Sequence, residues 1–167
     1  MPPNTHVHPS SSQENPMRTL VLLHILSAFI GLGPTYFTAI LLRRSQTPAA
    51  LRHNLALSET MSFFPKIGGT LAVLSGLALI WRGHYGPVTQ LWLLGSLALY
   101  ALIQIVIIGY AVPRTGRLAA WVGSPAGSEV GTLPGEQAAV LSQLQRAHLL
   151  VGALGAGLLV LMILKPH

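Results

Sequence analysis

His24 is the residue of this sequence with the clearest capacity for chemistry, because it lies well inside a long apolar run from Met17 to Leu42. An ionisable residue at such a depth in a membrane helix is costly and is by default a functional-site hypothesis. Its imidazole can ligate a metal or a haem iron, or relay a proton. A hydrogen-bonded structural histidine is the alternative. The residue type and its position leave these roles open.

Small residues are expected at the same depth as His24 in three other apolar runs. At a rise of 1.5 Å per residue, His24 lies about 10 Å inside one face of the membrane. Counting the same depth along the other runs reaches Ser75, Ser96 and Gly157. We therefore expect these residues at the level of the imidazole, where they would line a cofactor pocket or permit close helix packing.

The other histidines suggest a separate metal hypothesis. His84 and His167 are expected on the same membrane face as His24, so the three side chains could share a copper or zinc ion, which imidazole suits. His53 and His148 are expected on the opposite face and are therefore poor partners for His24.

Several other kinds of chemistry are excluded by residue types that the sequence lacks. Without Cys there are no disulfides, thiolate metal sites, iron–sulfur clusters or cysteine nucleophiles. Without Asp there is no Ser-His-Asp triad. The apolar runs contain no carboxylate, which argues against proton-coupled transport. No glycine-rich phosphate loop followed by Lys and Ser or Thr is present.

The composition identifies the protein class. Of the 167 residues, 51% are hydrophobic and 8% are charged, against about 25% charged in an ordinary soluble domain. So few charges cannot cover the surface of a soluble fold, and so many apolar residues argue against disorder. The net charge of +6 comes from basic residues scattered at the ends of apolar runs, not clustered on one face. This pattern predicts a protein in contact with the lipid bilayer and no nucleic-acid binding.

Four apolar runs predict an all-α integral membrane bundle of four transmembrane helices, each close to the 20 residues that a bilayer requires. Residues 1–16, rich in Pro, Ser and Asn, are predicted to form a disordered outer tail, and residues 17–167 the transmembrane domain. A short surface helix is expected at 49–60. The transmembrane helices are expected at about 17–42, 62–81, 90–110 and 134–164, the last with its membrane part at about 146–164.

The basic residues also predict an orientation. Seven of the ten Lys and Arg residues lie in or beside the loops expected at 43–61 and 111–145, and three lie on the other face. By the positive-inside rule, these two loops are cytoplasmic and both termini are outside. The predicted location is the bacterial inner (plasma) membrane, with several crossings.

Short motifs resemble a known group of small bacterial membrane proteins. They are His24-Ile-Leu-Ser, Gly31-Leu-Gly33-Pro-Thr-Tyr-Phe, Trp92-Leu, Leu97-Ala-Leu and the terminal Leu-Lys165-Pro166. The group includes the HemJ-type protoporphyrinogen oxidases, the copper-resistance-D-like proteins and an uncharacterised family of predicted integral membrane proteins. The resemblance covers most of residues 17–167. It implies a bundle of four or five helices in which the helix-one histidine, here His24, binds haem b.

The third helix departs from the HemJ-type pattern. That pattern has a His and a Lys where this sequence has Leu94 and Ser96. The resemblance therefore supplies no catalytic pair, and we do not expect protoporphyrinogen oxidation. The uncharacterised family is the closest fit.

The sequence is compatible with three functions. The first is a haem-b-binding redox or haem-handling protein with His24 as an axial ligand. The second is a non-catalytic membrane module, either a subunit of a larger membrane complex or a homo-oligomer, in which small residues serve helix packing. The third is copper or metal handling by the outer-face histidines.

Overall fold

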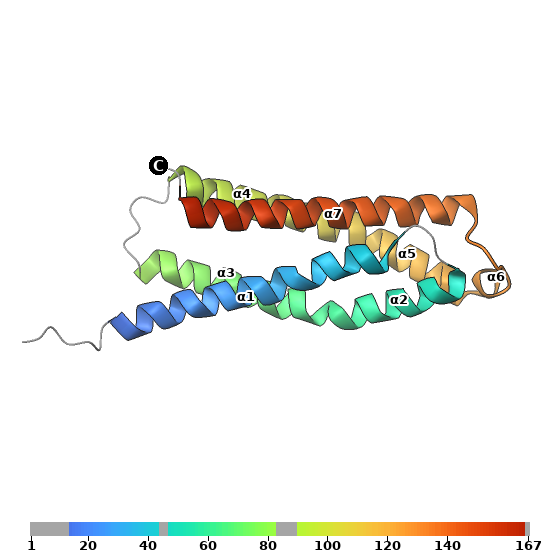
Figure 1. The fold of residues 1–167 in the computed structure, drawn as a ribbon, viewed down its shortest axis with the longest axis horizontal. Helices are drawn as coiled ribbons and strands as arrows, with labels where there is room; N and C mark the ends of the chain where they lie inside the picture. The colour runs from blue at the N-terminus through green and yellow to red at the C-terminus, as the bar shows by residue number, and fades with distance from the viewer. Residues whose placement is uncertain (1–13, 44–46, 83–89, 166–167) are drawn as a thin grey trace, which may run out of the picture.

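The computed structural model describes residues 14–43, 47–82 and 90–165, and these residues are almost entirely helical, with no strand among them. The predicted all-α class is therefore confirmed. In chain order the elements are α1 (Glu14–Leu41), α2 (Pro48–Met61), α3 (Phe63–Arg82), α4 (Leu91–Gln104), the π-helix η1 (Ile105–Ala111), α5 (Val112–Gly123), α6 (Pro125–Ser128) and α7 (Gly135–Leu164) (Figure 1). Most of the predicted tail lies outside the described residues.

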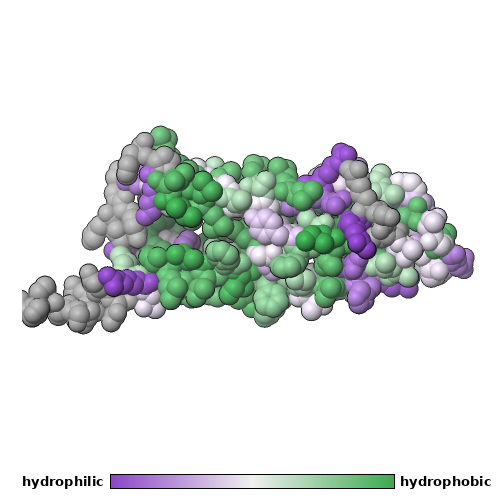
Figure 2. Space-filling view, viewed as in Figure 1, coloured by the Kyte–Doolittle hydropathy of each residue, from purple (hydrophilic) through white to green (hydrophobic). Residues whose placement is uncertain are grey.

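Four helical segments are long and apolar enough to cross a membrane, as predicted. They are Pro16–Leu41, Pro48–Arg82, Leu91–Gly123 and Gly135–Leu164. On the face shown in Figure 2, apolar residues cover much of the region between the two ends, as expected where lipid replaces water. The chain is an integral membrane protein with several spans.

The second span contains a break where α2 meets α3. The helix expected at 49–60 is present as α2, and Ser62 separates it from α3. Pro65 lies in the first turn of α3 and lacks the N–H that would continue the hydrogen-bond ladder back to Met61. The proline therefore accounts for the break, and the two helices follow one another with a single residue between them.

The third span continues past Tyr110, where we expected it to end before Pro113. The π-helix η1 connects α4 to α5, and the N–H of Val112 bonds to the carbonyl of Ile107, five residues earlier. A proline ring in a regular α-helix clashes with the carbonyl four residues before it. The wider π-turn relieves this clash, so the chain remains helical through Pro113 to Gly123.

The helices at membrane depth form two pairs. Helix α1 packs along α3, and α4 packs along α7. Contacts between α1 and α7 join the pairs, whereas no Cα atom of α3 lies within 8 Å of one in α4. In Figure 1 the α1–α3 pair lies below the α4–α7 pair, and both pairs converge toward α5.

The larger hydrophobic core lies beyond the end of α1, where α2, α5 and the first half of α7 meet. We call this region the α2–α5 end, and we call the opposite end, where α1 begins and α7 finishes, the terminal end. Besides the helices expected at 49–60 and from 134, the segment expected as a loop at 111–145 thus contains α5, which packs into this core. The buried core residues there are Leu42, Leu51, Leu55, Ala111, Leu118, Val122, Leu141 and Leu144.

Candidate functional site

The α1–α3 crossing is built on glycines that allow the two backbones to touch. A Cβ atom on Gly68 would lie 2.5 Å from the backbone nitrogen of Gly31 and 2.8 Å from the carbonyl oxygen of Ser27. Small residues permit such close approach between membrane helices, where packing replaces the hydrophobic effect as the main attraction. This crossing brings the first half of α1, which carries His24, against α3.

The His24 imidazole binds the backbone of α3 through one ring nitrogen. Its Nδ1 lies 2.9 Å from the carbonyl oxygen of Ala72 and 3.2 Å from Oγ of Ser75. A carbonyl oxygen can only accept a hydrogen bond, so the geometry assigns the ring hydrogen to Nδ1. In the neutral form of the imidazole, Nε2 then carries the lone pair.

The position of the ring is set by a glycine as well as by this hydrogen bond. A Cβ atom on Gly76 would lie 3.1 Å from Cε1 of His24, so the ring rests against the bare backbone of α3. The His24 side chain is half-buried. Among the residues that the structure describes, no hydrogen bond is made by Nε2, which lies on a different edge of the ring from the nitrogen that binds α3.

Of the residues expected at the depth of His24, only Ser75 lies beside it. Ser96 is buried on α4, where its hydroxyl donates to the carbonyl of Trp92 at 2.7 Å. No Cα atom of α1 lies within 8 Å of one in α4. Gly157 is exposed on α7, and a Cβ atom there would meet nothing within 4 Å. Ser96 and Gly157 therefore belong to the second helix pair.

The metal hypothesis falls largely on residues outside those that the structure describes. His84 and His167 lie outside the described residues. Over residues 14–43, 47–82 and 90–165, no group of three or more potential metal-binding side chains occurs. His53 is exposed on α2, and His148 is buried on α7 with Nδ1 2.9 Å from the carbonyl oxygen of Leu144.

Two glycines of α7 serve the contact between the helix pairs. The Tyr36 hydroxyl donates to the carbonyl oxygen of Gly152 at 3.0 Å, and a Cβ atom on Gly152 would lie 3.0 Å from the Tyr36 ring. A Cβ atom on Gly155 would similarly lie 3.0 Å from Leu32. The space that the two glycines leave open is therefore filled by side chains of α1.

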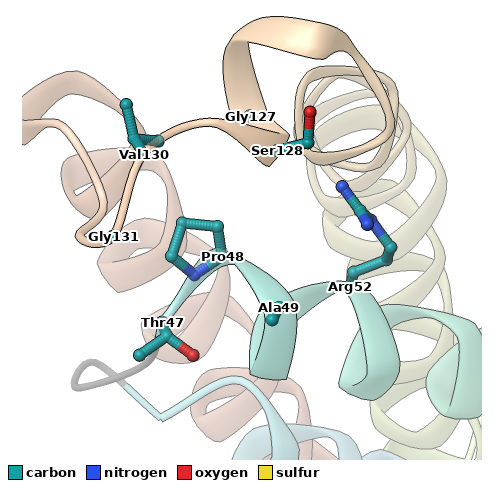
Figure 3. Close-up of a pocket in the computed structure, with 8 residues that line it drawn as sticks. All are labelled: Thr47, Pro48, Ala49, Arg52, Gly127, Ser128, Val130 and Gly131. Carbon is teal, nitrogen blue, oxygen red and sulfur yellow. The ribbon is translucent and has the colours of Figure 1, made fainter.

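The cavity drawn in Figure 3 lies far from His24, at the α2–α5 end. Its volume is about 180 Å³, and Arg52 is its charged residue. The Arg52 guanidinium donates to the carbonyl oxygen of Val122, from Nε at 2.9 Å and also from Nη2. A cation at the C-terminal end of α5 interacts favourably with the helix dipole. Arg52 therefore has a structural role here. The lining residues are Thr47, Pro48, Ala49, Arg52, Gly127, Ser128, Val130 and Gly131.

Sequence reasoning identified His24 but missed the group that orients it. The Ala72 carbonyl is part of the backbone, and every residue has such a group, so no residue type signals it. The spacing of Gly68, Ala72 and Gly76 was the available signal, because residues four apart share one helix face.

Comparison with known proteins identifies one family. The model of a family described as "Predicted integral membrane protein (DUF2269)" matches residues 18–166, which is nearly the whole chain. No curated protein and no solved structure matches it. The resemblance to HemJ-type and copper-resistance-D-like proteins therefore rests on the short sequence motifs alone and is not shown by these comparisons.

Proposed function

This chain belongs to the family described as predicted integral membrane protein (DUF2269), and from that premise we propose that it binds haem b within the membrane, with His24 as an axial ligand. The observation that carries the proposal is the hydrogen bond from His24 Nδ1 to the Ala72 carbonyl, at 2.9 Å. Histidines that ligate a metal usually donate their other N–H to a carbonyl, a carboxylate or water, which fixes the tautomer and the direction of the ring.

The residues around His24 fit a single axial ligand. Nε2 would be the atom that binds the iron, and Gly76 leaves space for the ring against α3. Haem iron is commonly held by one protein imidazole. A planar group also needs a gap between helices, and the α1–α3 and α4–α7 pairs separate toward the terminal end, where Figure 2 shows a hollow between them. Bound haem would supply one-electron redox chemistry.

The rest of the chain supports a binding or electron-handling role. Leu94 and Ser96 stand where the HemJ-type pattern has a His and a Lys, and Ser96 donates its hydrogen bond within its own helix. Neither side chain can act as an acid or a base near neutral pH. The contribution of this chain is thus to hold and orient the ligand in a medium that excludes water.

The test is an absorbance spectrum of the full chain, expressed with haem available and purified in detergent. We expect a Soret band that is lost in His24→Ala and retained in His53→Ala, a control at an exposed position of α2. Helical circular dichroism shows whether each variant is folded. Added imidazole should restore the band in His24→Ala if the side chain is a ligand.

A wild-type protein without a Soret band, or a band unchanged in His24→Ala, overturns the proposal. The first result would favour a non-catalytic membrane module. In that reading, the contacts at Gly68, Gly76 and Gly152 serve helix packing alone.

The finer localisation is also part of the proposal. We propose that the chain lies in the bacterial inner membrane with its α2–α5 end in the cytoplasm, because Arg43, Arg52, Arg114, Arg117 and Arg146 all lie at or near that end. The chain has no Cys, so single cysteines report sidedness directly. A membrane-impermeant maleimide added to intact spheroplasts should label Lys165→Cys and spare Ser128→Cys. The reverse pattern refutes this orientation.

A further inference from the structure

A pair of arginines lies where η1 and α5 meet α7. The guanidinium carbon of Arg114 is 3.6 Å from the centre of the Tyr110 ring, and its Nη1 donates to the Tyr110 carbonyl oxygen at 3.2 Å. The Tyr110 hydroxyl in turn donates to Oε1 of Gln143 at 3.3 Å. Arg146 follows Gln143 by three residues and therefore neighbours it on the same face of α7. The two arginines thus flank one Tyr–Gln contact.

The positive charge of this pair is not neutralised by the part of the chain that the structure describes. Neither Arg114 nor Arg146 forms an ion pair with a described acidic residue. The nearest acidic residue along α7, Glu136, is ten residues from Arg146, or about 15 Å along the helix axis. Arg146 is exposed, and Arg114 is partly exposed. An anion from outside the chain can therefore approach both guanidinium groups.

The pair lies at the expected boundary of the hydrocarbon layer. From Arg146 to the end of α7 at Leu164 the helix rises by about 27 Å, close to the hydrocarbon thickness of about 30 Å. Helix α3 has 20 residues, and its first two, Phe63 and Phe64, are exposed and pack edge to face. Aromatic side chains at a helix end are typical of the membrane interface.

Large apolar side chains continue from the arginine pair into the membrane. Ile105 and Ile108 of η1 are 66% and 64% exposed, and Leu149 of α7 is 58% exposed. These residues lie within about two turns of the arginines on the side toward the terminal end. A ligand at this place would have its anionic group beside the guanidinium groups and its apolar part along η1 and α7.

We propose that Arg114 and Arg146 bind the headgroup phosphate of an anionic phospholipid whose acyl chains lie along η1 and α7. The guanidinium fork matches phosphate oxygens in pairs, which a lysine ammonium does not. Tyr110 is a positioning residue, because its ring and its carbonyl oxygen hold the Arg114 guanidinium in place. This site is independent of His24 and of any haem.

The test compares how much phosphatidylglycerol the full chain retains when it is extracted from vesicles of phosphatidylcholine and phosphatidylglycerol, measured by native mass spectrometry. Arg146→Gln should lower the preference for phosphatidylglycerol about five-fold, and adding Arg114→Gln should lower it about five-fold again. The matched control is Arg82→Gln, which removes an exposed cation at the terminal end and should change little. Because Arg146 is exposed, its variant should fold, which circular dichroism can verify.

The proposal is overturned if Arg82→Gln reduces retention as much as Arg146→Gln, because the preference then reflects net charge. It is also overturned if the two substitutions abolish binding of inorganic phosphate to the purified chain and leave lipid retention unchanged, because the pair is then a site for free phosphate. Unchanged retention of phosphatidylglycerol in the Arg114→Gln, Arg146→Gln double variant also overturns the proposal.

Discussion

A Cβ atom on Gly68 would lie 2.5 Å from the backbone nitrogen of Gly31. At this point α1 and α3 are in backbone contact. Seven residues earlier on α1, about two helical turns away, His24 meets the Ala72 carbonyl of α3 at 2.9 Å. The close approach of the two backbones is therefore what allows a side chain of α1 to reach a main-chain group of α3.

Adding a methyl group at this crossing should separate the helices. We expect Gly68→Ala to lower the free energy of unfolding by about 1–3 kcal/mol, as overpacking does in other cores. The matched control is Gly69→Ala, one residue along, where a Cβ atom would meet nothing within 4 Å. There the change should be neutral or should stabilise α3 by up to about 1 kcal/mol. Thermal unfolding in detergent measures both, and equal destabilisation would contradict the packing described.

The orientation of His24 should depend more on Gly76 than on Ser75. A branched side chain in Gly76→Val would collide with the ring, because even its Cβ atom would lie 3.1 Å from Cε1. Ser75→Ala removes a weaker contact at 3.2 Å and leaves the Ala72 carbonyl in place. If haem binds at His24, haem occupancy measured by pyridine haemochrome should fall strongly in Gly76→Val and slightly in Ser75→Ala. The opposite ranking would show that Ser75 is the main orienting group.

The contact between the two helix pairs should be sensitive to one hydroxyl group. Tyr36→Phe removes the 3.0 Å hydrogen bond to the Gly152 carbonyl and keeps the ring against that glycine. Interhelical hydrogen bonds of this kind contribute about 0.6 to 2 kcal/mol, so unfolding in detergent should become easier by a similar amount. Tyr100→Phe is the control, since the Tyr100 hydroxyl makes no hydrogen bond within the described residues. Equal effects of the two substitutions would rule out this role for Tyr36.

The core at the α2–α5 end should carry much of the stability of the fold. Leu144 is fully buried there, so Leu144→Ala is expected to cost about 2–5 kcal/mol. Leu149 lies on the same helix but is 58% exposed, and Leu149→Ala should cost far less in a lipid or detergent environment. Chemical unfolding of both variants measures the difference. A similar loss in the two variants would mean that this core is not what stabilises α7.

The number of spanning helices could be predicted from the sequence because it depends on a local property. A helix that crosses a bilayer needs about 20 mostly apolar residues in succession, and this can be counted along the chain. The end of the third helix could not be predicted in the same way. Pro113 normally indicates a stop, but the π-turn from Ile105 to Ala111 accommodates it, and a π-turn has no comparable sequence signal.

The neighbours of His24 could be predicted only in part. Depth along a helix follows from counting residues, and this placed Ser75, Ser96 and Gly157 at one level. Depth does not say which helices touch or how each is rotated about its axis. In the structure α3 pairs with α1 and α4 pairs with α7, so that Ser75 alone lies beside the imidazole.

The sequence by itself determined the membrane class, the four apolar spans and the identity of the intramembrane histidine, because each follows from residue types along a single segment. Only the tertiary structure decided which ring nitrogen of His24 carries the hydrogen, that its acceptor is the Ala72 carbonyl, and that Tyr110, which holds Arg114, meets Gln143 of α7. These are relations between segments far apart in the chain. They depend on helix pairing and rotation, which arise from the backbone contact of Gly31 with Gly68 and the fit of Tyr36 against Gly152.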